Sequence, residues 1–204
     1  MQDKSKDGRL EELKVKMLQD ETLPLKKGAT NLVFGVGNPE TKILFIGEGP
    51  GFFEDKSGEP FVGNAGKLLN NLLQSIKLSR EDIYITNVVH HRPPENRDPT
   101  PFEIAAYGVY LDKIIEIINP KVIVTLGRFS MAKFLPTARI SSVHGQAQMI
   151  KFKGREVLIV PMYHPAAALR NGSVMVDEKA DFLKLPEYLK KVLEKVEIEQ
   201  KELF

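Results

Sequence analysis

The sequence contains no cysteine among its 204 residues. Disulfides, thiolate metal sites and iron–sulfur clusters are therefore excluded. The sequence also lacks an apolar run of the roughly 18–20 residues that a membrane-spanning helix needs. Residues 1–7 are too polar for a secretory signal. We therefore expect a cytoplasmic protein with no membrane contact.

An excess of charge of one sign is also missing. The net charge is +2, from 29 basic and 27 acidic residues, so charge alone does not indicate a nucleic-acid partner. The length suits one sizeable domain, and the hydrophobic content of 42% is ordinary for a globular protein. We expect a single domain over residues 1–204, with a charged C-terminal helix from about residue 177.

Four short apolar runs predict the strands of a central sheet. Their apolar residues are consecutive rather than alternating, which is typical of strands that are covered on both faces. The runs are Ile43–Ile46, Ile83–Ile85, Val122–Leu126 and Val157–Val160.

Helical patterns separate these runs, at residues 67–77, 104–118 and 128–135. Alternating strands and helices predict an α/β fold, a three-layer α/β/α sandwich with a central, mostly parallel four-stranded sheet. The spacing of Leu10, Leu13 and Met17 predicts a further helix near the N-terminus. We also expect a short strand near residues 32–34 and a hairpin turn at residues 153–154.

Unusual residues follow three of the four predicted strands. Residues 47–66 form a glycine-rich loop with acids and a phenylalanine, residues 86–99 are rich in histidine, arginine and proline, and residues 161–171 include His164. Open α/β sheets bind ligands at the carboxyl ends of their strands. The sequence therefore predicts one site that is built from all three segments. Pro50 interrupts the glycine pattern expected of a dinucleotide-binding loop.

These three segments resemble the three motifs of the family 4 uracil-DNA glycosylases, in the same order and at similar spacing. The motifs lie at residues 47–66, 86–97 and 163–170, and the resemblance extends from about residue 10 to residue 181. It implies a uracil-DNA glycosylase-like fold. It also implies a DNA repair enzyme that flips deoxyuridine out of single- or double-stranded DNA, hydrolyses its N-glycosidic bond and leaves an abasic site.

The resemblance implies a role for each residue of a uracil pocket. Phe61 would stack on the base, and Asn87 would hydrogen-bond its edge. His164 would donate to O2 as negative charge develops there. Glu54 would crowd the C5 edge and help to reject the methyl group of thymine. Glu48, or a backbone carbonyl near it, would help to position the attacking water. The implied catalytic residues are Glu48, Asn87 and His164, and the implied uracil-binding residues are Gly49, Glu54, Phe61, Asn87 and His164.

A second group of residues would contact DNA outside the pocket. Leu169 would fill the gap that the flipped base leaves, and the remaining residues would contact the backbone or the extruded nucleotide. The implied DNA-binding residues are Arg92, Asn96, Arg97, Arg128, Leu169 and Arg170.

The sequence departs from the family at the four cysteines that typically hold a four-iron, four-sulfur cluster. Asp20, Leu23, His91 and Tyr107 stand at those positions, so we expect no cofactor and no metal, with polar and aromatic packing in their place. Gly49 stands where alanine is usual, and the inserted basic loop of a covalently reacting subgroup is missing.

Two other functions compete with the glycosylase. Loss of the cluster suggests a catalytically weak relative that binds DNA or a repair partner, and the glycine-rich loop could belong to an enzyme that binds a small nucleotide. The end of the chain, residues 200–204, faintly resembles a sliding-clamp-binding peptide, although a frayed helix end explains it better. We expect a monomer.

Overall fold

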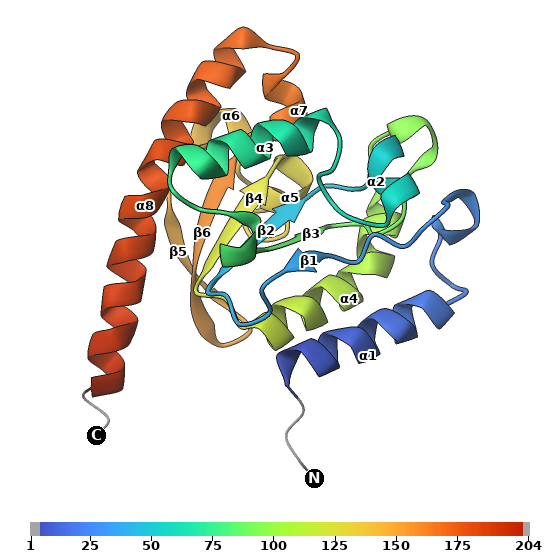
Figure 1. Cartoon of the computed structure of the whole chain (residues 1–204), viewed down its shortest axis with the longest axis horizontal. Coiled ribbons are helices and arrows are strands. Elements are labelled where there is room, and N and C mark those ends of the chain that lie inside the picture. Colours follow the sequence, from blue (N-terminus) through green and yellow to red (C-terminus); the bar gives the residue numbers. More distant parts are fainter. Residues whose placement is uncertain (1–4, 202–204) are drawn as a thin grey trace.

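The computed structural model describes residues 5–201, except for the side chains of residues 193 and 195–201. Its centre is a six-stranded sheet (Figure 1). In spatial order the strands are β1 (Val36–Gly37), β3 (Tyr84–Asn87), β2 (Ile43–Gly47), β4 (Val122–Leu126), β6 (Arg155–Met162) and β5 (Gln148–Phe152).

The predicted four-stranded sheet is the parallel centre of this larger sheet. Strands β3, β2, β4 and β6 pair in parallel, while β1 and β5 add antiparallel edges. The prediction of four strands was therefore too low by the two edge strands. The strand expected at residues 32–34 is wrong in position, since β1 begins at Val36. The hairpin at residues 153–154 is confirmed between β5 and β6.

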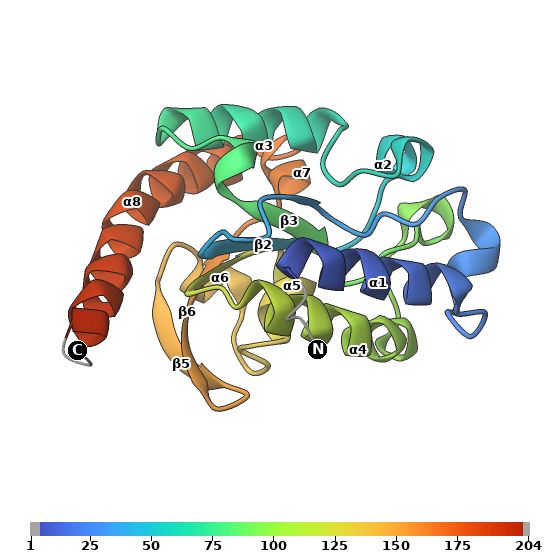
Figure 2. The same cartoon turned by 60° about the horizontal axis from the view of Figure 1, so that its bottom comes forward.

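Helices cover both faces of the sheet, which confirms the three-layer sandwich. Figure 2 shows α1 (Lys6–Gln19) and α4 (Pro101–Ile118) on one face, and α3 (Asn64–Ser75) and α8 (Gly172–Lys201) on the other. Each face of the sheet has its own hydrophobic core. Successive residues of β2 point to opposite faces, so Leu44 packs in the core under α1 and α4 and Phe45 packs in the core under α3 and α8. This two-sided burial explains why its apolar residues are consecutive.

The C-terminal helix and several shorter helical elements complete the fold. The charged C-terminal helix begins five residues earlier than expected, at Gly172, and the peptide at residues 200–204 lies outside the described side chains. The other helical elements are η1 (Lys26–Gly28), α2 (Phe52–Ser57), η2 (Arg80–Asp82), η3 (Pro94–Asn96), α5 (Arg128–Ala132), α6 (Ile140–Val143) and α7 (Pro165–Ala168).

The four positions that the family resemblance assigns to cluster cysteines are occupied by packed side chains. His91 Nδ1 hydrogen-bonds the Tyr107 hydroxyl at 2.8 Å, and both residues are buried. The Tyr110 hydroxyl donates to Asp20 Oδ2 at 2.6 Å, and Leu23 is buried. This donor set has no thiolate and does not fit an iron–sulfur cluster.

Candidate active site

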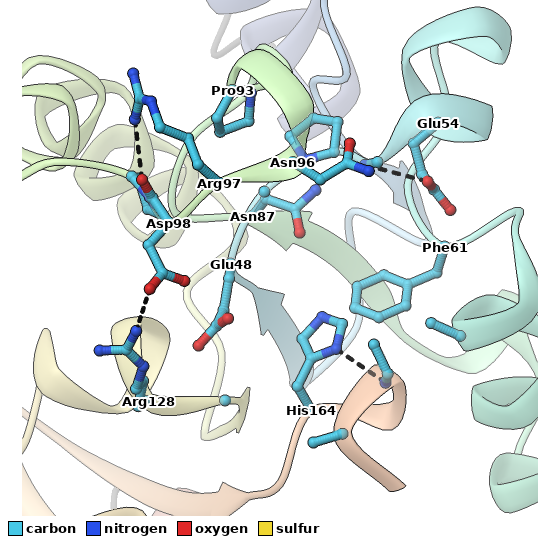
Figure 3. Close-up of a pocket in the computed structure, with 18 of the residues that line it drawn as sticks. Glu48, Glu54, Phe61, Asn87, Pro93, Asn96, Arg97, Asp98, Arg128 and His164 are labelled. Carbon is cyan, nitrogen blue, oxygen red and sulfur yellow. Dashed lines mark hydrogen bonds and ion pairs between the residues drawn. The ribbon is translucent and has the colours of Figure 1, made fainter. Parts of the chain in front are cut away.

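A cavity of about 600 Å³ opens at the carboxyl ends of the parallel strands. Figure 3 shows side chains from the loops after β2, β3, β4 and β6 converging on it. Of the residues that the sequence predicts for the site, only Arg92 and Leu169 are not among those lining the cavity. The predicted residues that line it are Glu48, Gly49, Glu54, Phe61, Asn87, Asn96, Arg97, Arg128, His164 and Arg170.

Glu48 is held at the cavity wall by the start of α5, which follows β4. Its Oε1 accepts a hydrogen bond from the backbone N–H of Phe129 at 3.0 Å. Its carboxylate packs against Gly127, where a Cβ would lie 2.3 Å from Oε1. Burial raises the pKa of Glu48, and the Phe129 N–H and the nearby Arg128 charge oppose that rise. A carboxyl group with a raised pKa is a better proton acceptor once it is ionised.

Asn87 ends β3 with an unused donor. Its side chain is 1% exposed, and its Nδ2 has no hydrogen-bond partner among the described residues. A Cβ on Gly47, the last residue of neighbouring β2, would lie 2.4 Å from Asn87 Oδ1 and 2.7 Å from Phe61 Cε2. Glycine at this position therefore lets the amide and the aromatic ring approach each other. A buried, unpaired donor of this kind favours a ligand that accepts from it.

Phe61 is fixed in a backbone conformation that is rare for its residue type, with φ of 55°. The Arg80 guanidinium donates to the carbonyls of Pro60, at 3.0 Å, and of Phe61. Gly66 in α3 packs against the Phe61 carbonyl so closely that a Cβ there would lie 1.7 Å from its oxygen. Sequence reasoning missed Arg80, because it acts on backbone groups and belongs to none of the three motifs.

His164 lies beside Phe61, with ring centroids 5.5 Å apart and planes inclined by 25°. Its Nδ1 accepts a hydrogen bond from the backbone N–H of Ala166 at 3.1 Å. The neutral ring therefore carries its proton on Nε2. Burial lowers the pKa of His164 to about 4, with a smaller contribution from Arg170. At neutral pH the ring is an uncharged Nε2–H donor.

Glu54 organises the loop around the cavity. Its Oε1 accepts from the backbone N–H groups of Val62, at 2.9 Å, and Gly63, at 2.8 Å. Its Oε2 accepts from the Gly51 N–H at 3.2 Å. Three backbone donors thus fix the carboxylate at the cavity wall, and through it the loop that carries Phe61.

Two arginines of the rim, Arg97 and Arg128, each form an ion pair with an acidic side chain. Arg97 makes a two-pronged pair with Glu103, at 2.8 and 2.6 Å, and lowers the pKa of that carboxyl to about 2. Arg97 therefore ties the rim to the first turn of α4, and its contact with DNA stays a prediction. Arg128 pairs with Asp98. Asp98 lines the cavity too, and the motif-based prediction did not include it.

Arg92, which lies outside the cavity lining, donates from Nε to Asn96 Oδ1 at 2.7 Å. Leu169, also outside the lining, is half-exposed. Arg170 lines the cavity, and its Nε donates to the Ala166 carbonyl at 3.1 Å. No group of three or more histidine, aspartate or glutamate side chains suited to a metal ion occurs within the described part of the chain. The geometry therefore combines an aromatic face, a free amide donor, a neutral imidazole donor and a carboxylate around one cavity.

These groups lie at the strand ends of an α/β sheet, where open α/β sheets bind their ligands. The family model of the uracil DNA glycosylase superfamily matches residues 34–197. This chain belongs to the uracil-DNA glycosylase superfamily, and within it to the group of the type-4 enzymes.

Curated relatives carry the type-4 assignment. The type-4 uracil-DNA glycosylase of Archaeoglobus fulgidus is 48% identical over 169 residues, covering 80% of this chain and 84% of the relative. That of Thermotoga maritima is 49% identical over 150 residues, covering 74% and 78%. The type-5 uracil-DNA glycosylase of Thermus thermophilus is 32% identical over 116 residues, covering 50% and 52%.

Proposed function

We propose that this protein is a uracil-DNA glycosylase that hydrolyses the N-glycosidic bond of deoxyuridine in DNA and leaves an abasic site for base-excision repair. The observation that carries this proposal is that three groups suited to binding uracil line the same cavity. The unpaired Asn87 Nδ2, the Phe61 ring and the neutral His164 ring surround one cavity. The type-4 relatives support the same reaction.

The pocket groups suit a uracil that has been flipped out of the DNA stack. The Phe61 ring offers an aromatic surface for the base. The Asn87 amide offers a donor and an acceptor to the uracil edge. Glu54, with both carboxylate oxygens fixed by backbone donors, would occupy the space beside C5 and exclude the methyl group of thymine.

Bond cleavage moves the C1′–N1 electron pair onto the uracil ring, with negative charge on O2. The His164 Nε2–H is the donor for that oxygen, and its neutral state leaves it ready to donate without prior proton transfer. One preorganised donor of this kind contributes about 3–4 kcal/mol of transition-state stabilisation. A water oxygen then bonds to C1′, and the Glu48 carboxylate would orient that water and accept its proton.

Residues at the rim would hold the DNA. Leu169 is half-exposed and can fill the gap left by the flipped base, and Arg170 and Arg92 can reach the phosphates. Arg128 would exchange its Asp98 partner for a phosphate. We expect the protein to act as a monomer in the cytoplasm and to need no metal. A sliding clamp or another repair protein stays a predicted partner.

The substrate range tests this proposal. Oligonucleotides with one uracil, and matched ones with thymine or cytosine, are incubated with the protein, and abasic sites are revealed with alkali. The protein should release free uracil from single- and double-stranded DNA and leave thymine and cytosine in place. Tight binding of uracil-DNA without release of the base would refute the proposed glycosylase function and favour a catalytically weak relative that binds DNA.

A further inference from the structure

Two adjacent phenylalanines at the start of α2 are exposed beside the cavity mouth. Phe52 is 45% exposed and Phe53 is 60% exposed. Their rings contact each other edge to face, with centroids 5.5 Å apart. Large aromatic side chains are usually buried, so an exposed pair near a pocket indicates a binding surface.

A chain of contacts joins Phe52 to the cavity. Gly51, which precedes it, lines the cavity. The guanidinium carbon of Arg92 also lies 5.3 Å from the centroid of the Phe52 ring. Arg92 Nε in turn donates to Asn96 Oδ1 at 2.7 Å, and Asn96 lines the cavity. Phe52 therefore lies one side chain beyond the rim.

Cations flank this aromatic pair. Besides Arg92, the Lys56 ammonium lies 4.8 Å from the centroid of the Phe52 ring. Lys56 is exposed, and the one-turn spacing on α2 places its charge over the face of the ring. A platform that joins an aromatic face to positive charge matches a nucleotide, which joins a flat base to a negative phosphate.

We propose that Phe52 and Phe53, with Arg92 and Lys56, form a stacking subsite for a base next to the flipped uracil in single-stranded DNA. This inference rests on the proposed function, because it needs uracil in the cavity. The base stacks on the face of the Phe52 ring, which Phe53 supports edge to face, and takes the place of the cations there. The Lys56 and Arg92 side chains then bind the phosphate that links this base to the uracil nucleotide. In a duplex the neighbouring base stays paired and stacked, so the subsite favours single strands.

Fluorescence of 2-aminopurine tests this contact directly. The probe is placed on the 5′ or the 3′ side of an uncleavable 2′-fluorinated deoxyuridine in a single strand. Stacking on Phe52 should quench it when the wild-type protein binds, at one of the two positions. Phe52→Ala should abolish the additional quenching, and Phe52→Trp should retain it.

Affinities provide the second readout. Phe52→Ala should weaken binding of the single-stranded uracil oligonucleotide about tenfold, since stacking of one base on an aromatic side chain typically accounts for roughly a 5- to 150-fold difference. The loss for the matched duplex should be clearly smaller. Leu183→Ala is the control, because Leu183 is 65% exposed on α8 and does not line the cavity.

The outcomes separate this inference from the proposed function. If the wild-type protein excises uracil but Phe52→Ala leaves both quenching and the single-strand preference unchanged, the subsite is refuted and the glycosylase stands. If the wild-type protein binds the probe with quenching that depends on Phe52 but releases no uracil from a cleavable substrate, the subsite is supported and the proposed glycosylase function is refuted. Retained duplex binding by Phe52→Ala excludes misfolding as the cause of its loss of single-strand binding.

Discussion

Removing the Tyr107 hydroxyl should destabilise the protein strongly, because that hydroxyl is the partner of a buried histidine. Tyr107 is 0% exposed, and its hydroxyl lies 2.8 Å from His91 Nδ1. Tyr107→Phe keeps the ring but leaves Nδ1 without this partner. An unsatisfied buried polar group costs about 1–3 kcal/mol. With a urea dependence of roughly 2 kcal/mol per molar, the unfolding midpoint should fall by about 1 M.

Tyr110→Phe is the matched control for that measurement. It also removes one tyrosine hydroxyl, but Asp20 keeps its hydrogen bonds from the Thr22 side chain and backbone, at 2.6 and 2.9 Å. The free energy of unfolding should therefore fall by less than about 1 kcal/mol. Equal urea midpoints for Tyr107→Phe and the wild-type protein would refute the argument that the hydrogen bond between His91 and Tyr107 stabilises the fold at these two cysteine positions of the family.

Three further predictions concern pH, packing and charge. Burial lowers the pKa of His90 to about 3 and that of His91 to about 4, so the unfolded chain takes up protons below pH 6.5 before the folded one does. Each of these two histidines should therefore lower the free energy of unfolding by about 2 kcal/mol as the pH falls from 7 to 5, as measured by urea titration. A free energy of unfolding that does not change with pH over this range would contradict the prediction. Gly66→Ala should displace the pocket phenylalanine and reduce uracil excision at least tenfold, whereas Gly108→Ala, where a Cβ has no neighbour within 4 Å, should raise stability by about 0.5–1 kcal/mol and leave excision unchanged. Asp98→Asn removes the acid that pairs with a rim arginine, so DNA binding measured by fluorescence anisotropy should tighten and its logarithmic salt slope should steepen by up to about 1, and weaker binding would be the contrary result.

The sequence predicted the parts of the fold that depend on burial on both faces. Consecutive apolar residues in β2 and β4 identified parallel strands, because each face of the sheet meets a helix layer. The edge strands differ. β1 has only two residues, one of which is a glycine, and its pairing depends on the backbone of β3 rather than on any side-chain pattern. Such a strand leaves no periodic signal.

The site could be predicted where its chemistry belongs to side chains at strand ends. Asn87 and His164 lie together because their parallel strands end at the same edge of the sheet. Contacts to backbone groups could not be predicted in this way. Arg80 binds two carbonyls of the phenylalanine loop, and the Phe129 N–H binds Glu48. These partners depend on folded geometry rather than on residue type.

We propose that the pocket excises uracil through its amide and imidazole donors. The most direct test is the single-turnover rate of uracil release by the wild-type protein, Asn87→Ala and His164→Ala, with Leu183→Ala as the control. We predict that His164→Ala is slower by roughly 100- to 1,000-fold, as expected for loss of one preorganised donor, and that Asn87→Ala is also strongly impaired. Rates within threefold of the wild-type rate for both variants would contradict the account.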